Sequence, residues 1–199
     1  MDKFDVTVIG SGPGGYVAAI RCAQLGMKTA IIERFSTLGG TCLNVGCIPS
    51  KALLDSSEHY HNALKNFGKH GIETEGVRLN WPGMLGRKDD VVGKICSGVE
   101  YLMKKNEIKV IHGYGSFENN QKVLDQGEDG SNIFVETENV IIATGSNPSS
   151  IPGVQIDKQR IITSMEALKL PEITKKMVVI VGGICELDLG LLYSSLGTE

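Results

Sequence analysis

Apolar residues near the start of the chain follow the patterns of a strand, a helix and a second strand. Residues 4–9 are mostly apolar and have the pattern of a buried strand, and residues 14–25 are rich in alanine and other apolar side chains, as in a helix. Gly26 follows at the position of a helix C-cap, and residues 28–32 have the pattern of a second strand. Two strands around one helix within about 30 residues predict a βαβ unit with parallel strands and a right-handed crossover.

The middle of the chain contains the patterns of two longer helices and several strands. Helical spacing of apolar residues predicts helices over residues 49–66 and 84–105, and residues 109–112 form a short strand pattern. Short apolar runs separated by turn residues predict a small antiparallel meander over residues 116–137. Residues 140–143 are all apolar, which is typical of a strand inside a parallel sheet.

The last part of the chain contains the beginning of a second strand–helix pattern. Residues 148–152 have the composition of a linker, residues 176–180 predict a strand, and a helical pattern ends near residues 196–197. A single strand and helix cannot make a domain. We therefore expect the chain to be the N-terminal part of a longer protein or a truncated product.

Composition and charge exclude some classes of function. The chain has 199 residues, of which 41% are hydrophobic and 22% are charged, enough for one good-sized core or two small ones. The net charge of −3 gives no electrostatic case for nucleic-acid binding, and no apolar run approaches the roughly 18 residues of a membrane helix. The first residues lead almost at once into a strand pattern, so we expect that the protein works where it is made or that a presequence is already absent.

A glycine-rich turn lies between the first predicted strand and the first predicted helix. Gly10, Gly12 and Gly15 give the spacing G-x-G-x-x-G, which permits a tight turn, close approach of a pyrophosphate and close helix–strand packing. Bound phosphates meet the positive end of the helix. Glu33 ends the second strand, where a carboxylate can accept hydrogen bonds from a ribose. The pattern predicts a Rossmann-like dinucleotide-binding domain; the alternative is a glycine-rich turn without a ligand.

Two of the five cysteines are separated by only four residues. The five are Cys22, Cys42, Cys47, Cys96 and Cys185. Cys47 stands where a helix is predicted to begin, and there the backbone N–H groups and the helix dipole stabilise a thiolate. Lys51 follows one helical turn later, so its ammonium group can face the same site. Cys42 and Cys47 therefore indicate a redox couple, with two buried thiols or a static disulfide as the alternatives.

The other cysteines and the histidines do not indicate a metal site. A zinc ion needs about four ligands, and the four histidines show no complementary pairing with the cysteines. The odd, sparse cysteine count does not fit a secreted disulfide scaffold either. We expect no metal, and we expect Cys22 and Cys96 to be core thiols.

These motifs together resemble those of a known family of flavoenzymes. The run GGTCLNVGCIPSKALL, with GSGPGGYVAAIRCAQLG before it and VIIATGS after it, resembles the flavin-dependent pyridine nucleotide-disulfide oxidoreductases, and among them the dihydrolipoamide dehydrogenases. The similarity extends along essentially the whole chain but covers less than half of the family's length. Glutathione, thioredoxin and mercuric reductases share the cysteine loop, whereas residues 48–54 most resemble the lipoamide enzymes.

The resemblance implies an α/β fold and a division into domains. An FAD-binding domain with a parallel sheet, inserted helices and the small meander would occupy residues 1–150, and residues 151–199 would form a linker and the incomplete start of an NAD-binding domain. The interface domain that forms the family's homodimer would be absent. The residues implied to hold FAD are Gly10, Gly12, Gly14, Gly15, Glu33, Arg34, Gly40, Thr41, Cys42, Lys51, Gly115, Ala143, Thr144 and Gly145.

The resemblance also implies a reaction, in which dihydrolipoamide is oxidised through FAD with NAD as the electron acceptor. Cys42 would be the outer thiol that exchanges with the lipoyl group, Cys47 the inner thiolate that contacts the flavin, and Lys51 would stabilise charge near it. The implied partners are lipoyl-bearing domains of 2-oxo acid dehydrogenase complexes, in the mitochondrial matrix or the bacterial cytoplasm. The family's catalytic His–Glu dyad, which the partner subunit donates, has no counterpart in this sequence.

The second nucleotide motif departs from the family pattern. The corresponding residues run from Val181 through Gly182 and Gly183 to Glu186, and only Gly183 stands where a glycine is required. Val181 places a branched side chain in a tight turn, and Glu186 adds a carboxylate near a pyrophosphate. Asp188 replaces, one methylene shorter, a glutamate that can pair with the flavin-side lysine. Gly182, Gly183 and Asp188 are the candidate cofactor contacts of this motif, and its departures from the family pattern argue against NAD binding by this chain.

Two further functions compete with the dihydrolipoamide reaction. One is a related disulfide reductase that acts on glutathione, thioredoxin or mercuric ion with NADPH as the donor. The other is a non-catalytic, flavin-binding or interaction protein made from a truncated gene. Because the base and the NAD domain are incomplete, we expect the isolated chain to be inactive by itself.

Overall fold

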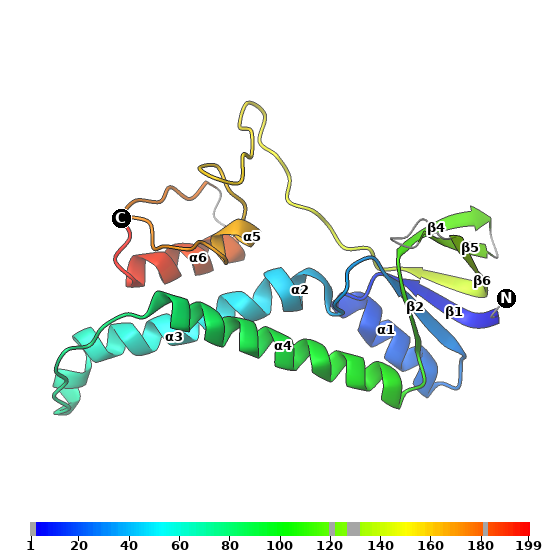
Figure 1. The fold of residues 1–199 in the computed structure, drawn as a ribbon, viewed down its shortest axis with the longest axis horizontal. Coiled ribbons are helices and arrows are strands. Elements are labelled where there is room, and N and C mark those ends of the chain that lie inside the picture. Colours follow the sequence, from blue (N-terminus) through cyan, green and yellow to red (C-terminus); the bar gives the residue numbers. More distant parts are fainter. Residues whose placement is uncertain (1–2, 120–121, 127–131, 181–182) are drawn as a thin grey trace. The chain divides into compact units, whose positions relative to one another are not determined.

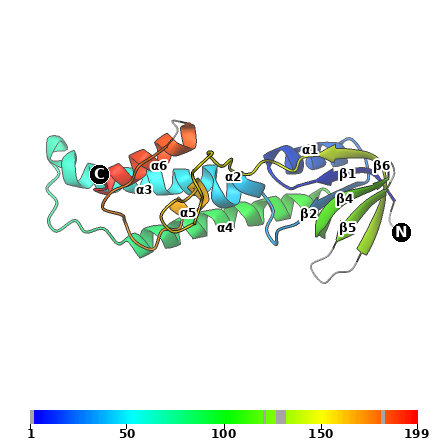
Figure 2. The ribbon, with the colours of Figure 1, turned by 90° about the horizontal axis from the view of Figure 1, so that it is seen from above.

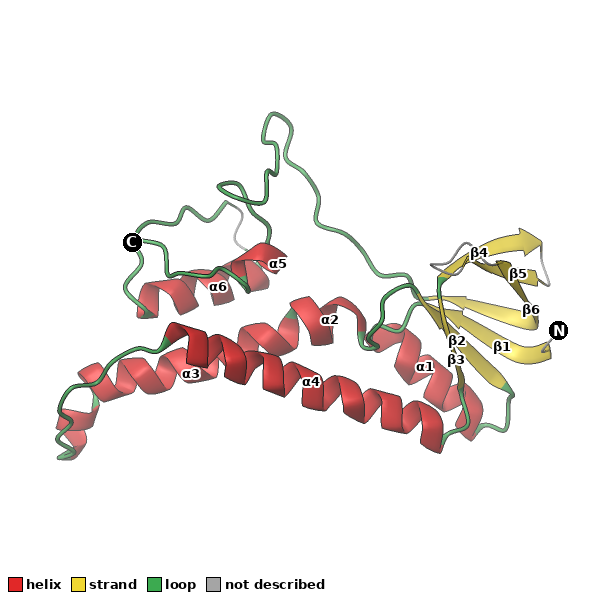
Figure 3. Cartoon of the chain, viewed as in Figure 1, coloured by secondary structure: helices red, strands yellow, loops and turns green. Residues whose placement is uncertain are grey.

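The computed structural model describes residues 3–119, 122–126, 132–180 and 183–199, and the chain forms two compact units. The sheet unit comprises Met1–Asn44 and Lys94–Asn147, and the helical unit comprises Val45–Gly93 and Pro148–Glu199. Figure 3 shows the strands of the sheet unit and the helices of both units. The domain boundary expected near residue 150 stays a prediction.

The described residues of the sheet unit form six strands in the order β3-β2-β1-β6-β5-β4 (Figure 1). Their bounds are β1 Lys3–Ile9, β2 Thr29–Glu33, β3 Lys109–His112, β4 Tyr114–Asn119, β5 Lys122–Gln126 and β6 Asn132–Ile142. β1 runs parallel to β2 and β6, and β2 runs parallel to β3, whereas β4, β5 and β6 form an antiparallel meander. The predicted α/β class with a parallel sheet and a small meander is confirmed.

The first βαβ unit forms as predicted. Helix α1 (Pro13–Gln24) connects β1 to β2 and lies beside both strands (Figures 1 and 2). Gly26 adopts a left-handed φ of +86°, and its N–H donates to Ala23 O at 2.9 Å, which ends the helix. All five residues of β2 are buried, as expected for a strand in the middle of a parallel sheet.

The helical unit packs its helices around one apolar cluster. It contains α3 (Cys47–Lys65), a 3₁₀ turn at Phe67–His70, the start of α4 (Trp81–Lys105), α5 (Ser164–Ala167) and α6 (Ile184–Ser195). Its buried cluster consists of Leu53, Trp81, Ala167, Leu168, Leu189, Leu192 and Tyr193. The Tyr193 hydroxyl donates to Ala167 O at 2.5 Å, and burial raises the pKa of Tyr193 to about 12.

None of the helices in the described ranges has the length and apolar character of a membrane span.

Three expectations about individual elements were wrong. Residues 176–180 form no strand, and Val178 and Ile180 are 87% and 58% exposed, because the described residues offer this segment no neighbouring strand to pair with. Residues 36–47, between the strand predicted at 28–32 and the helix predicted at 49–66, were expected to contain no helix but include a short one, α2 (Gly40–Val45). The predicted end of the meander and residues 140–143 belong largely to one strand, β6, which pairs with β5 along its first half and with β1 along its second.

Candidate functional site

The glycine turn between β1 and α1 has the backbone conformation that its sequence predicts. Gly10 has a left-handed φ of +97°, and a Cβ atom at this position would collide with the carbonyl oxygen of Ala143. A Cβ atom at Gly15 would collide with the carbonyl oxygen of Gly10. Both glycines are therefore required by close backbone approach, Gly10 to the end of β6 and Gly15 within the turn itself.

The beginning of α1 fits a phosphate-bearing ligand. Gly12 is the N-cap residue, and no side chain caps the helix. The nearest heavy atom to a Cβ on Gly12 would be Gly40 Cα at 3.9 Å, and a Cβ on Gly14 would have no neighbour within 4 Å. Uncapped N–H groups next to open space at the positive end of a helix suit the pyrophosphate of a dinucleotide.

Glu33 is buried and serves as the acceptor for three protein donors. Its Oε2 accepts from Ser11 N at 2.9 Å and from Ser11 Oγ at 2.6 Å, and its Oε1 accepts from Phe35 N at 3.0 Å. The residue is only 5% exposed. Glu33 therefore ties the glycine turn to the end of β2, and its expected contact with a ribose stays a prediction.

The start of the cysteine loop lies directly against the glycine turn. Gly39 N donates to Ser11 O at 3.0 Å, and Gly39 and Gly40 both have left-handed φ angles, +103° and +59°. A Cβ on Gly40 would lie 2.6 Å from Gly12 Cα. α2 starts at Gly40 and carries the half-buried Cys42, so the chain brings one predicted redox thiol next to the predicted pyrophosphate site.

The second thiol and its lysine begin the helical unit. Cys47 is the first residue of α3 and is exposed, in agreement with its predicted place at a helix N-terminus. Lys51 lies one turn further along α3, and its Nζ contacts Asp188 Oδ2 of α6 at 2.6 Å. Asp188, although one methylene shorter than the family's glutamate, therefore forms an ion pair with Lys51.

The remaining residues predicted to contact FAD lie in β4, in α2 or directly after strands β2 and β6. Ala143 follows β6, and its N–H donates to Ile9 O at 2.8 Å. A Cβ on Gly115 in β4 would lie 3.1 Å from Ile9 Cγ2, so a residue larger than glycine would be crowded at this position. The predicted FAD contacts of Thr144, Gly145, Arg34 and Thr41 stay predictions.

The second nucleotide motif does not fit a pyridine nucleotide in its described part. Gly183 is the N-cap residue of α6, and a Cβ on it would lie 2.5 Å from Glu186 Oε2. The Glu186 carboxylate thus occupies the end of the helix where a pyrophosphate would need positive potential. Val181 and Gly182 lie outside the described residues, and the strand expected before them is absent from residues 176–180.

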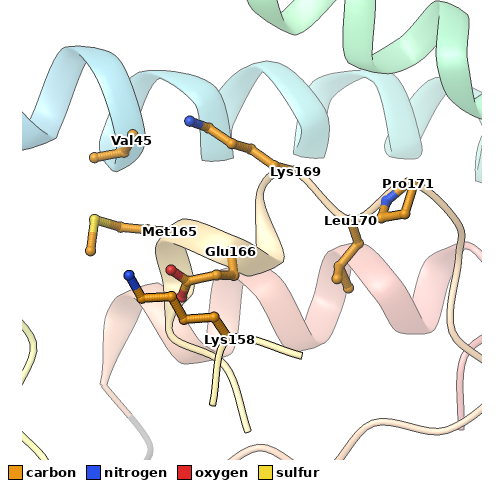
Figure 4. A pocket seen from close by; sticks show the side chains of 7 residues that line it. All are labelled: Val45, Lys158, Met165, Glu166, Lys169, Leu170 and Pro171. Atoms are coloured by element: carbon orange, nitrogen blue, oxygen red, sulfur yellow. The ribbon is translucent and has the colours of Figure 1, made fainter. Parts of the chain in front are cut away.

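A separate hollow of about 380 Å³ lies in the helical unit (Figure 4). Its lining residues are Val45, Lys158, Met165, Glu166, Lys169, Leu170 and Pro171. In Figure 4 the amine of Lys158 and the carboxylate of Glu166 end beside each other. A hydrogen bond from the Thr163 hydroxyl is the main cause that lowers the pKa of Glu166. None of the residues predicted to contact FAD or to carry the thiols lines this hollow.

The sequence patterns missed two side chains that organise the cysteine loop. Asn44 makes four hydrogen bonds, one of them with the buried Cys96, and Ser11 links the glycine turn to Glu33 and Gly39. A serine inside a glycine motif and an asparagine between two cysteines were the available signals. Of the two expected core thiols, Cys96 is buried and Cys22 is half-buried.

Comparisons with known proteins agree with the glycine turn and cysteine loop described above. Residues 4–199 match the family model described as pyridine nucleotide-disulphide oxidoreductase. The chain is 50% identical over 198 residues to leghemoglobin reductase of Vigna unguiculata and 48% identical over 198 residues to mitochondrial dihydrolipoyl dehydrogenase 1 of Arabidopsis thaliana. All of this chain aligns in both cases, with 38% and 39% of the relatives' lengths, so the chain spans about two fifths of the curated relatives that it matches.

A solved structure supports the fold. The copper(II) complex of the HOCl-induced flavoprotein disulfide reductase RclA from Escherichia coli superposes with a TM-score of 0.84 at 24% identity. The match covers 100% of this chain and 42% of that chain.

Proposed function

Because this chain belongs to the pyridine nucleotide-disulphide oxidoreductase family, we propose that it forms the FAD-binding and dithiol-bearing part of a dihydrolipoyl dehydrogenase. The observation that carries the proposal is the close approach of the cysteine loop to the glycine turn, in which Gly40 lies against Gly12. The proposed domains are an FAD domain over residues 1–150 and the beginning of a second nucleotide domain over residues 151–199.

The proposed FAD site uses the residues that the sequence singled out. Gly10, Gly12, Gly14 and Gly15 surround the pyrophosphate position at the start of α1, and Gly40 closes it from the cysteine loop. The other proposed contacts are Glu33, Arg34, Thr41, Cys42, Lys51, Gly115, Ala143, Thr144 and Gly145. Bound FAD supplies a two-electron acceptor for the dithiol.

The chain's own chemistry is thiol–disulfide exchange. In the oxidised chain, a thiolate of dihydrolipoamide attacks Cys42 Sγ of a Cys42–Cys47 disulfide, and Cys47 leaves as a thiolate. The second substrate thiolate then attacks the sulfur joined to Cys42, which releases lipoamide and leaves Cys42 reduced. The Cys47 thiolate forms at the N-terminus of α3 with Lys51 one turn away, where the helix dipole and the ammonium group both favour negative charge.

The final electron acceptor depends on the second nucleotide motif. The family implies a pyridine nucleotide, but the Glu186 carboxylate at the start of α6 does not fit one. No catalytic His–Glu dyad is present in the chain either. We therefore propose that this chain alone exchanges thiols and takes up FAD but does not reduce NAD.

The proposed partners are the lipoyl-bearing domains of 2-oxo acid dehydrogenase complexes, and a homodimer for a protein of the relatives' full length. The proposed compartment is the mitochondrial matrix, because several relatives are named mitochondrial. The bacterial cytoplasm is the alternative location.

The visible spectrum of the purified protein, loaded with FAD and titrated with dithionite, tests the proposal. We expect a yellow protein that gains long-wavelength thiolate–flavin absorbance after two-electron reduction. Cys47→Ser abolishes this band, whereas Cys42→Ser shows it before any reduction, because Cys47 then has no disulfide partner, and loses it when two electrons reduce the flavin. Cys185→Ser is the matched control, since Cys185 is also an exposed cysteine near the start of a helix. A folded protein that takes up no FAD, or a band that survives in Cys47→Ser, overturns the proposal and favours a protein without the redox role.

A further inference from the structure

We propose that Asn44 is a positioning residue of the redox loop, which holds the helix that carries Cys42 against the glycine turn. The inference rests on the proposed function of Cys42, but the geometry behind it lies in residues 37–44 and in Cys96. These residues all belong to the sheet unit. The role differs from that of the thiols, since Asn44 acts through the backbone of the loop.

Asn44 uses the full hydrogen-bonding capacity of its side-chain amide. Its Nδ2 donates to Leu38 O at 3.0 Å and to Gly40 O at 2.9 Å. Its Oδ1 accepts from the Thr37 hydroxyl at 2.9 Å and from the Cys96 thiol at 3.5 Å. A primary amide has two N–H donors and two acceptor lone pairs, so each is used once.

The hydrogen-bond partners determine the orientation of the Asn44 side-chain amide. The two backbone carbonyls can only accept, so the amino group must face them and the carbonyl oxygen must face Thr37 and Cys96. Cys96 is 4% exposed, and burial, with a smaller effect of Glu100, raises the pKa of its thiol above the ordinary value. The thiol therefore keeps its proton at neutral pH and remains a donor to Asn44.

The two carbonyls that Asn44 binds flank the most constrained point of the loop. Gly39 and Gly40 are consecutive residues with left-handed φ angles, a conformation that a free chain adopts only at an entropic cost. Asn44 bonds the carbonyl before Gly39 and the carbonyl of Gly40 itself, and so it fixes this pair. The same pair places Gly40 against Gly12, so loosening Asn44 separates Cys42 from the proposed flavin site.

Alkylation of the reduced protein by iodoacetamide, followed by peptide mass spectrometry, tests the inference without FAD or turnover. Asn44→Asp keeps the shape but turns a carboxylate toward two carbonyls, and Asn44→Ala removes all four bonds. Both variants should raise the alkylation rate of Cys42 about tenfold by local opening of the loop. Cys96 should stay unlabelled, which shows that the sheet unit is still folded. Asn106→Ala is the matched control, because Asn106 also donates to a backbone carbonyl, Leu102 O at 2.8 Å, away from the loop.

A second readout separates positioning from simple stabilisation. In dithiothreitol buffers the two thiols of the chain close to the Cys42–Cys47 disulfide while oxidised dithiothreitol takes up their two electrons and two protons. A looser loop loses more entropy on ring closure, so the equilibrium constant for closure should fall about fivefold in Asn44→Ala and not in Asn106→Ala. If both the alkylation rate and this constant match those of the unchanged protein, the inference is wrong.

Two variants of Cys96 test the same inference if the Asn44 variants do not fold. Cys96→Ser retains a donor to Asn44, and Cys96→Ala removes it. We expect faster alkylation of Cys42, about threefold, only in Cys96→Ala. Equal rates in the two variants overturn the inference. Failure of FAD uptake in the spectrum refutes the proposed function alone, because neither thiol measurement involves FAD.

Discussion

Glu33 provides the sharpest test of how the glycine turn is held. Its carboxylate accepts from Ser11 N, Ser11 Oγ and Phe35 N, and both Glu33 and Ser11 are buried. A hydrogen bond to a charged group contributes about 1.5–3 kcal/mol, and a buried donor left without an acceptor costs about 1–3 kcal/mol. These contributions overlap, since all three bonds converge on one group.

The expected losses follow from which donors each variant leaves unsatisfied. Glu33→Ala leaves the buried Ser11 N–H without its acceptor. The Phe35 N–H also loses its acceptor, but Phe35 is 56% exposed, so this group can bond to water. We expect the free energy of unfolding to fall by about 3–4 kcal/mol. In Glu33→Gln the amide oxygen can keep both Ser11 donors while its amino group faces Phe35 N, so the expected loss is about 1–2 kcal/mol.

Urea unfolding followed by far-ultraviolet circular dichroism measures both losses. Glu138→Gln is the matched control, because Glu138 is half-exposed and forms an ion pair with Lys3 at 3.0 Å, which is expected to contribute about 0–1 kcal/mol. The urea dependence of the free energy should be the same in all variants, so that midpoints report stability. A loss below about 1 kcal/mol in Glu33→Ala, or a loss equal to that of the control, would refute the role of Glu33 in holding the glycine turn.

Three further predictions concern the turn and the helical unit. The added methyl group in Gly15→Ala collides with the backbone of its own turn, so the free energy of unfolding should fall by about 3 kcal/mol or more. The methyl group in Gly14→Ala meets no atom within 4 Å, so the urea midpoint should stay unchanged or rise. Equal losses of stability in the two variants would contradict this geometry. Burial raises the pKa of Tyr193 to about 12, so its contribution to stability is complete below the ordinary value near 10 and declines as pH rises toward about 12. Urea midpoints measured from about pH 9 to 11 should fall more steeply than those of Tyr193→Phe, and parallel curves would contradict this. Asp188→Asn should change the free energy of unfolding by less than about 1 kcal/mol in the same assay, because its partner Lys51 is 61% exposed; a larger loss would show that the pair is screened less than its exposure indicates.

Local chemistry made the first βαβ unit predictable. The turn from Gly10 to Gly15, the helix that follows and the C-cap at Gly26 each depend on residues within a few positions of one another. Backbone freedom at glycine and the period of apolar side chains are properties of such short segments, so the sequence alone was sufficient. The position of Cys47 at the start of α3 was predictable for the same reason.

Interactions between distant residues decided the rest. The apolar segment 176–180 has a strand sequence, but a strand also needs a paired neighbour, which the described residues do not provide. The segment around Cys42 contains a helix, α2. Directly before this helix Gly39 N donates to Ser11 O of the glycine turn, and near its end Asn44 accepts from Cys96, 52 residues further along the chain.

The acceptor role of Glu33 illustrates the same division. Its place at the end of β2 could be predicted from the apolar pattern before it, but its three donors depend on how the glycine turn and the chain after β2 fold toward it. A sequence determines which residues can donate, accept or adopt a left-handed turn. Only the tertiary structure decides which of these capacities meet, because burial leaves each polar group dependent on the partners that packing brings within reach.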